Sequence, residues 1–262
     1  MKRAAFLLHT LILVCTIQAQ INYKVIKVNG SIQYVRTGSK MALGDEFAET
    51  ENLTFGSPSA RAAVINPGKG RFILTPESAG KLTGAKSNFL PARSNISTRG
   101  GALNSLNDVQ NQFSEAVAII YKASWHINPY QFPMDENRFF FLQYQYNGEQ
   151  INKKLPSHES NLVFSREEIL KVDDQSIEKL DNPGAKLYYY SADGPQYISE
   201  FDLIFPEIEL LKSEAGIILV EFSSMDYSRK VNELSGYLFE FYGKPDKEDV
   251  MFFLEKDFGL KK

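Results

Sequence analysis

The sequence contains one cysteine, Cys15, and three histidines among its 262 residues. Cys15 and His9 both lie in an N-terminal stretch that we expect to be removed from the mature chain. A chain without thiols forms no disulfide and offers no thiolate nucleophile. The two remaining histidines, His126 and His158, are far apart and belong to no His-x-x-x-His pair. The sequence therefore predicts no metal site.

Catalytic and phosphate-binding motifs are also missing. No Gly-x-Ser-x-Gly sequence occurs, and Gly68-Lys-Gly70 lacks the spacing of a phosphate or dinucleotide loop. Adjacent acids such as Asp173-Asp174 are typical of a solvated turn. We therefore expect no cofactor and assign no catalytic residue.

A hydrophobic run long enough for a membrane-spanning helix is missing as well. The apolar stretch at residues 4–17 is shorter than the roughly 20 residues that such a helix needs. Lys2 and Arg3 precede this stretch, and small and polar residues end it. A cationic start, a short apolar segment and a small residue at the end predict a secretory signal peptide over residues 1–19, cut after Ala19.

This N-terminal stretch has two alternative interpretations. One is an anchor that is not cleaved. The other is lipid attachment at Cys15, although Val14 precedes it where lipoprotein signals carry Gly, Ala or Ser. In each case we expect an exported protein, located in the periplasm or outside the cell, or associated with the outer membrane. With the signal peptide cleaved, as we expect, the mature chain has no transmembrane segment.

The charge balance disfavours a nucleic-acid partner. Loss of Lys2 and Arg3 with the signal peptide changes the formal net charge from −3 to −5. Binding to phosphates requires a basic surface, which an acidic chain lacks overall. We therefore expect no nucleic-acid partner. The expected partners are another envelope protein or an anionic glycan, the latter because of a basic segment described below.

The first part of the mature chain has the pattern of a small antiparallel β structure. Short segments with alternating or continuous apolar residues are separated by Gly, Pro and Asn, which is typical of a sandwich or a barrel-like sheet. The predicted strands are 23–29, 31–36, 43–47, 60–65 and 71–74.

Short motifs rich in glycine and serine recur through the predicted β structure: Gly30, Leu43-Gly44-Asp45, Ser57, Ser59-Ala60 and the hairpin that ends in Phe72-Ile-Leu74. Through these residues the segment 23–80 resembles a FecR-like domain, a small β module of bacterial envelope proteins. The resemblance implies a FecR-like β domain over residues 20–76. Regulators of the FecR type carry a cytoplasmic part and a membrane helix before this module, where this chain has an export signal. We therefore expect the module without the regulatory role.

A Gly-, Ser- and Asn-rich segment, residues 77–103, is predicted to be a linker. It contains basic residues but has no acidic residue after Glu77. We identify Arg93, Arg99, Gly100 and Gly101 as a candidate contact for an anionic partner, since Gly-Gly offers mobile backbone amides beside a fixed charge. The alternative is a solvated loop.

Residues 104–262 are predicted to form a mixed α+β domain, because strands and helices occur there without regular alternation. Asn147-Gly148 predicts a tight hairpin turn. Apolar residues at helical spacing, followed by glycine, predict two closing helices. The predicted elements are a helix at 106–115, a strand or continued helix at 116–121, hairpin strands at 138–146 and 149–155, a strand at 186–190, a helix at 206–214, a strand at 216–222 and helices at 231–242 and 246–259.

Aromatic residues provide a second candidate site. Trp125, Tyr188 and Tyr190 are candidates for a ligand platform, since aromatic faces stack on sugars and peptides. Their alternative role is in the core.

The favoured function is a non-enzymatic exported envelope protein for binding, scaffolding or signal relay. The alternatives are an envelope hydrolase of an unrecognised type, based on His126 or an acidic pair, and a glycan-binding module.

Overall fold

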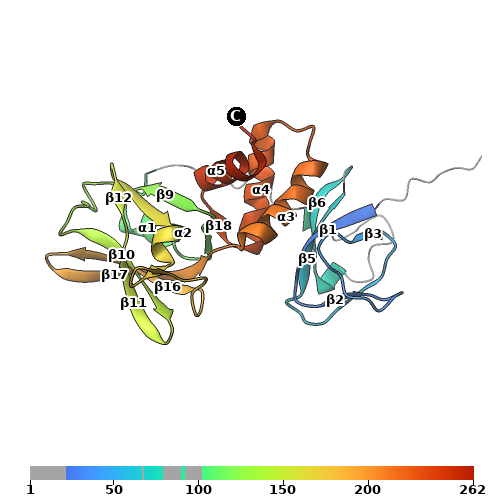
Figure 1. Ribbon diagram of the computed structural model, residues 1–262, viewed down its shortest axis with the longest axis horizontal. Helices are drawn as coiled ribbons and strands as arrows, with labels where there is room; N and C mark the ends of the chain where they lie inside the picture. The colour runs from blue at the N-terminus through green and yellow to red at the C-terminus, as the bar shows by residue number, and fades with distance from the viewer. Residues whose placement is uncertain (1–21, 67, 79–89, 92–101) are drawn as a thin grey trace, which may run out of the picture.

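The computed structural model describes residues 22–66, 68–78, 90–91 and 102–262. It has three parts along its long axis: an N-terminal β unit (22–78 with 90–91), a C-terminal β unit (102–206) and a helical layer (207–262) that lies between the two β units (Figure 1). The expected mixed α+β class is confirmed.

The N-terminal β unit contains a five-stranded antiparallel sheet in the order β3-β1-β5-β6-β7 and a separate β2–β4 ribbon. One face of the sheet buries Tyr23, Val25 and Val64 in a core within this unit. The elements are β1 (Asn22–Asn29), β2 (Ile32–Tyr34), β3 (Glu46–Ala48), β4 (Leu53–Phe55), β5 (Arg61–Asn66), β6 (Gly70–Leu74), the 3-10 helix η1 (Pro76–Ser78) and β7 (Leu90–Pro91).

The C-terminal β unit packs a six-stranded sheet against the three-stranded sheet β12-β13-β9. The order of the six strands is β11-β10-β16-β17-β8-β18, and the last of them, β18 (Lys244–Pro245), comes from the segment 207–262. The core between them contains Phe140, Leu142, Phe164, Leu187 and Phe201. The elements are α1 (Leu106–Gln112), β8 (Val117–Ala118), β9 (Lys122–His126), β10 (Phe139–Tyr146), β11 (Glu149–Lys154), β12 (Ser157–His158), β13 (Asn161–Ser165), α2 (Arg166–Ile169), β14 (Lys171–Val172), β15 (Gln175–Ser176), β16 (Gly184–Ser191) and β17 (Gly194–Ile204).

The predicted Asn-Gly hairpin is confirmed. Asn147 and Gly148 have φ values of 53° and 77°, the positive values that a type I′ turn requires. Tyr146 lies opposite Glu149, so only these two residues form the loop. Phe140, Leu142 and Tyr144 are buried, as expected for one face of a strand with a two-residue period.

The helical layer contains α3 (Ile208–Glu221), α4 (Tyr227–Phe241) and α5 (Lys247–Phe258), with β18 (Lys244–Pro245) between the last two. The two predicted closing helices are confirmed. The predicted strand at 216–222 is wrong, because α3 continues through it. Leu211, Ala215 and Ile218 are buried at helical spacing, and a short apolar run does not distinguish a strand from a buried helix.

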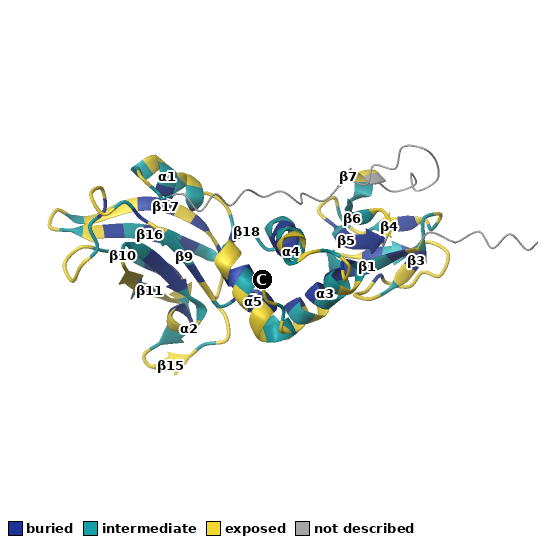
Figure 2. Ribbon diagram, turned by 90° about the horizontal axis from the view of Figure 1, so that it is seen from above, coloured by how far each residue is buried: buried dark blue, intermediate teal, exposed yellow. Residues whose placement is uncertain are grey.

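The helical layer shares a core with the N-terminal β unit. Ile26, Ala63 and Ile65, on the sheet face opposite Val25, are completely buried in the same cluster as the apolar sides of α3, α4 and α5. Figure 2 shows α3 next to β1, and α3 contacts both β1 and β5. The N-terminal sheet is therefore covered on both faces, and its outer neighbour is a helical layer from the far end of the chain.

Two buried ion pairs cross this interface. The Lys27 Nζ donates to Glu214 Oε1 at 2.8 Å and to the Tyr242 hydroxyl at 2.7 Å, and the Tyr242 hydroxyl donates to Glu214 Oε2 at 2.6 Å. The Arg71 guanidinium, which is fully buried, pairs with Glu240. In both pairs a cation from the sheet meets a carboxylate from a helix of the helical layer.

Candidate binding face

Five aromatic rings cover one end of the outward face of the six-stranded sheet. We call this set the aromatic ladder: Phe139, Phe141, Tyr188, Tyr190 and Tyr197. Register places Phe139 opposite Tyr190, Phe141 opposite Tyr188, and Tyr188 opposite Tyr197. The strand period directs these side chains away from the core, since their neighbours Phe140, Leu187 and Tyr189 are buried.

The ladder rings contact one another across the strands. The Phe141 and Tyr188 rings stack with centroids 5.0 Å apart, and those of Phe139 and Tyr190 stack at 5.1 Å. Tyr197 meets Tyr188 edge-on at 5.7 Å. Tyr190 and Tyr197 are 40% and 50% exposed, so these two tyrosines present accessible rings, whereas Tyr188 is half-buried between its neighbours.

A shallow polar groove continues the same sheet face beyond the ladder. Its volume is about 190 Å³. We call it the amide groove, because amide side chains and one ion pair line it. Lys186 and Glu200 form that pair at 3.9 Å. The lining residues are Gln143, Tyr144, Gln145, Gln150, Asn182, Gly184, Lys186 and Glu200.

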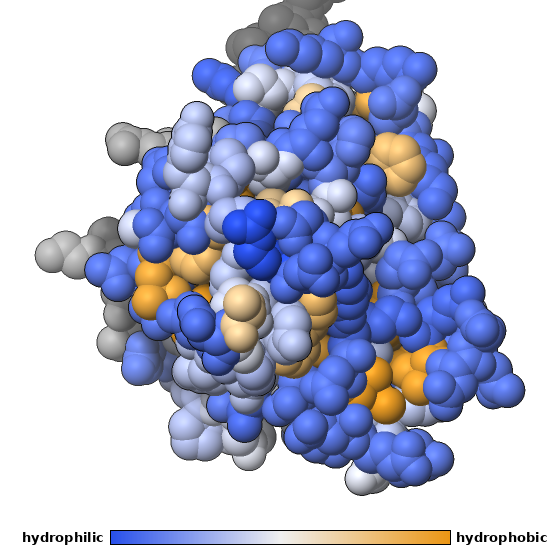
Figure 3. Space-filling view, turned by 90° about the vertical axis from the view of Figure 1, so that its left-hand side faces the viewer, coloured by the Kyte–Doolittle hydropathy of each residue, from blue (hydrophilic) through white to orange (hydrophobic). Residues whose placement is uncertain are grey.

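The end of the molecule that carries β10, β11 and β17 is largely hydrophilic, with small hydrophobic groups between the polar side chains (Figure 3). Charged residues flank the ladder directly. The Lys154 Nζ lies 4.2 Å from the centroid of the Phe139 ring. This surface therefore combines ring faces, amides and charges rather than presenting one continuous apolar patch.

The structure brings together two of the three residues proposed for the ligand platform. Tyr188 and Tyr190 share the outward face, with the buried Tyr189 between them. Trp125 lies on β9 in the other sheet, where its half-buried ring packs edge-on against Phe113 and Phe164, each at 5.0 Å. It fills space beside the core and does not join the tyrosines.

Sequence reasoning missed Phe139, Phe141 and Tyr197 as members of the site. The two phenylalanines alternate with the buried residues of the hairpin strand, and this alternation is a signal that could have found them. Tyr197 carries no such signal. The register of β17 shifts between the partners of Leu187 and Tyr188, so the regular alternation along β17 does not predict that Tyr197 lies beside Tyr188. The contact proposed for an anionic partner, Arg93, Arg99, Gly100 and Gly101, lies outside the described residues, and it stays a prediction.

His126 has an exposed side chain on β9. Its Nδ1 lies 3.3 Å from Asn161 Oδ1 on the neighbouring strand. The His126 ring therefore contacts an amide side chain. His158 is exposed and lies 3.8 Å from Glu159. Among the described residues, no group of three His, Cys, Asp or Glu side chains is placed to hold a metal ion.

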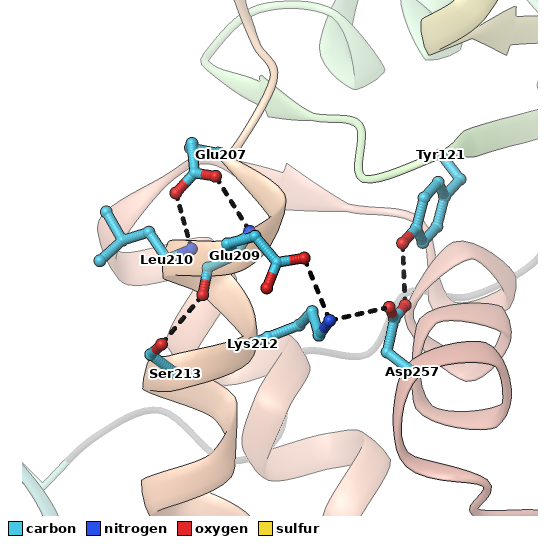
Figure 4. Close-up of polar contacts among 7 residues, drawn as sticks. All are labelled: Tyr121, Glu207, Glu209, Leu210, Lys212, Ser213 and Asp257. Atoms are coloured by element: carbon cyan, nitrogen blue, oxygen red, sulfur yellow. Dashed lines mark hydrogen bonds and ion pairs between the residues drawn. The ribbon is translucent and has the colours of Figure 1, made fainter.

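Carboxylates at both ends of α5 fix the C-terminal β unit to the helical layer. Asp249, which is 1% exposed, accepts hydrogen bonds from the backbone N–H groups of Ile120, Tyr121 and Lys122 at 2.7–3.0 Å. At the far end of α5, Asp257 accepts from the Tyr121 hydroxyl at 2.8 Å and meets Lys212 of α3 at 4.0 Å (Figure 4).

Burial explains the titration of these groups. Desolvation, followed by the hydrogen bond to Asp257, raises the pKa of Tyr121 to about 12. Desolvation also raises the pKa of Asp249, although its three N–H donors oppose the shift. These groups therefore act as structural ties between α5 and the C-terminal β unit, and they do not line the sheet face.

A wider groove, of about 970 Å³, lies in the N-terminal β unit beside β2 and β3. Its polar groups largely pair with one another. The Tyr34 hydroxyl donates to Asp45 Oδ2 at 3.1 Å, and Arg36 meets Glu51 at 3.5 Å. Burial and the neighbouring Asp45 raise the pKa of Tyr34 above its usual range. The groove offers no ordered row of exposed rings.

Comparison with known proteins found neither a matching family model nor a matching curated protein. No helix within the described ranges is both long and apolar enough to cross a bilayer.

Proposed function

We propose that this chain is an exported, non-enzymatic protein of the bacterial cell envelope that works as a binding and scaffolding module. In this proposal residues 1–19 are the export signal and residues 20–76 form a FecR-like β domain. The observation that carries the proposal is the aromatic ladder, a row of stacked and partly exposed rings on the outward face of a sheet. Exposed aromatic rings held in place by their neighbours are typical of recognition surfaces.

The interface between the N-terminal β unit and the helical layer supports the scaffolding part of the proposal. Lys27 and Glu214 form a buried pair there, and Asp249 ties the helical layer to the C-terminal β unit. A ligand on the sheet face is therefore held at a fixed position relative to the FecR-like module. Rigid presentation of a ligand is what a scaffold requires.

Co-sedimentation with isolated envelope fractions tests the proposal. We expect the exported chain to sediment with the envelope and a Y188A/Y190A variant to remain in the supernatant. Tyr130→Ala is the matched control, since Tyr130 is 95% exposed and lies outside the ladder. Absence of wild-type protein from every envelope pellet would contradict the proposal, as would equal sedimentation of all three proteins.

A further inference from the structure

We infer that the outward face of the six-stranded sheet binds a neutral polysaccharide chain along its strands. This inference rests on the proposed binding function and adds the class of ligand. It draws on three properties of the face: the ring faces of the ladder, the hydrogen-bonding groups of the amide groove, and the charge balance.

The ladder provides stacking surfaces for sugar rings. A pyranose ring has an apolar face of C–H groups, which packs against the face of an aromatic ring. Tyr190 and Tyr197 are 40% and 50% exposed. Phe139 stacks on the Tyr190 ring, and Tyr188 contacts the Tyr197 ring edge-on, so both exposed rings are held in place. Because stacking already orients the rings, binding costs little additional side-chain entropy.

The amide groove provides partners for sugar hydroxyls. Each Gln or Asn side chain offers both a donor and an acceptor, as a hydroxyl group does. Gln145 and Gln150 have exposed side chains, and the Gln143 Nε2 donates to Asn152 Oδ1 at 3.1 Å, which fixes the orientation of that amide pair. The polar half of the face therefore matches a ligand with many neutral hydroxyl groups.

The charges of the face cancel, and this argues for a neutral ligand. The strand register directs Lys154 and Lys186 outward together with Glu200 and Asp202. Two cations and two anions leave no net charge. A nucleic acid, an anionic lipid surface or an acidic glycan requires an excess of cations. A neutral polysaccharide needs none.

The length of the face favours a chain over a single sugar. The ladder and the groove lie on the same strands, with Phe139 at one end and Gln145 at the other. Six residue steps along an extended strand span about 20 Å. This exceeds one sugar ring, so consecutive rings of one chain would meet first the aromatic half and then the amide half.

Titration calorimetry with soluble neutral β- and α-linked glucans tests the inference. We expect the wild-type protein to bind at least one of them, with little dependence on salt. Tyr188→Ala and Tyr190→Ala should each raise the dissociation constant about tenfold, as expected for loss of a stacked ring. Tyr188→Phe should lose much less affinity than Tyr188→Ala, because the ring that stacks remains.

Control variants and control ligands distinguish loss of sugar stacking from misfolding and from binding to another kind of ligand. Tyr130→Ala should leave the affinity unchanged. A single cooperative thermal unfolding transition above the temperature of the binding experiment shows that the Tyr188 and Tyr190 variants fold, although loss of a cross-strand ring pair should lower its midpoint. Failure of the wild-type protein to bind either glucan would overturn the inference, as would affinity that is insensitive to Tyr188→Ala. Binding to polygalacturonate alone, with steep salt dependence, would also overturn it. If the protein still sediments with envelopes after their glycans are destroyed by periodate, the binding function stands and the polysaccharide inference fails.

Discussion

The ring of Phe141 on β10 lies almost parallel to the ring of Tyr188 on β16, with an angle of 8° between their planes and 5.0 Å between their centroids. Phe139 and Tyr190 repeat this arrangement at the next outward position, with an angle of 21°. Cross-strand aromatic pairs stabilise a sheet and fix the position of each ring. The ladder is therefore a preformed surface rather than a set of independent side chains.

Removing Lys27 should destabilise the protein strongly. Its ammonium group neutralises Glu214, which is 1% exposed, and Lys27→Met leaves that carboxylate buried without its charged partner. Loss of one member of a buried pair costs about 3–5 kcal/mol. Urea unfolding measures the change.

The matched control for this prediction lies on the same strand. Lys24 meets Glu46 at 3.8 Å with both side chains partly exposed, so Lys24→Met should cost less than about 1 kcal/mol. The double variant K27M/E214L should recover part of the loss. Equal stability of the two single variants would show that the interface does not depend on the Lys27–Glu214 pair.

Asp249→Ala should loosen the contact between α5 and the C-terminal β unit. The substitution leaves the three backbone N–H groups of Ile120, Tyr121 and Lys122 without their acceptor. Each buried donor without a partner costs about 1–3 kcal/mol, so we expect a loss of several kcal/mol in unfolding experiments. Tyr121→Phe, which removes one hydrogen bond to Asp257, should cost only about 1 kcal/mol. A comparable loss in both variants would contradict this account.

Parts of the fold follow from local sequence, and these parts were predicted correctly. Asn147-Gly148 specifies a two-residue turn, and Gly243 followed by Pro245 ends a helix. The prediction for the apolar run from Gly216 to Phe222 is wrong, because a run of this length suits a strand as well as a buried helix. In the structure the run continues α3 and packs in the cluster shared with β1, β5, α4 and α5.

The candidate site was only partly predictable, because its geometry depends on pairing between distant strands. Tyr188 and Tyr190 share a face by the two-residue period alone. Their stacking on Phe141 and Phe139 depends on the pairing of β10 with β16, which no local pattern specifies. Trp125 was assigned to the platform by residue type, but β9 places it beside the core. The Lys27–Glu214 pair joins residues 187 positions apart and leaves no sequence signal.

Asp246 should make stability depend on pH between about 4 and 6. Burial raises the pKa of this carboxyl to about 6 in the folded protein, against about 3.9 in an unfolded chain. Since the folded state binds the proton more tightly, the stabilising contribution is complete below pH 4 and is lost as pH rises to 6. Asp246→Asn removes the titration and keeps an acceptor for the Glu248 N–H at the N-cap, but it loses the acceptor for the Ser124 N–H, a cost that does not vary with pH.

Urea unfolding at several pH values checks this prediction. Relative to D246N, the wild-type free energy of unfolding should fall by up to about 3 kcal/mol between pH 4 and pH 6.5. Asp226→Asn serves as reference, because Asp226 caps α4 with a side chain that is 66% exposed. Parallel pH curves for the wild-type protein and D246N would contradict the predicted shift.

Gly243→Ala should destabilise the junction between α4 and β18. Gly243 has a φ of 120°, and a Cβ atom there would lie 2.5 Å from the carbonyl oxygen of Ala116. Both the backbone strain and the clash oppose the substitution, so we expect a loss of more than about 1 kcal/mol. Gly216→Ala is the control, because Gly216 lies inside α3 with open space around it and alanine favours a helix by about 1 kcal/mol. Thermal unfolding should shift in opposite directions for the two variants.

The most direct test of the central claim is to observe the ladder rings during ligand binding. NMR spectra of the protein with isotope-labelled tyrosine rings, recorded as a soluble neutral glucan is added, report on each ring separately. We predict saturable shifts of the Tyr188, Tyr190 and Tyr197 signals, with Tyr130 unchanged. Shifts confined to Tyr34 in the N-terminal groove, or no shifts at all, would contradict the claim that the outward sheet face binds the ligand.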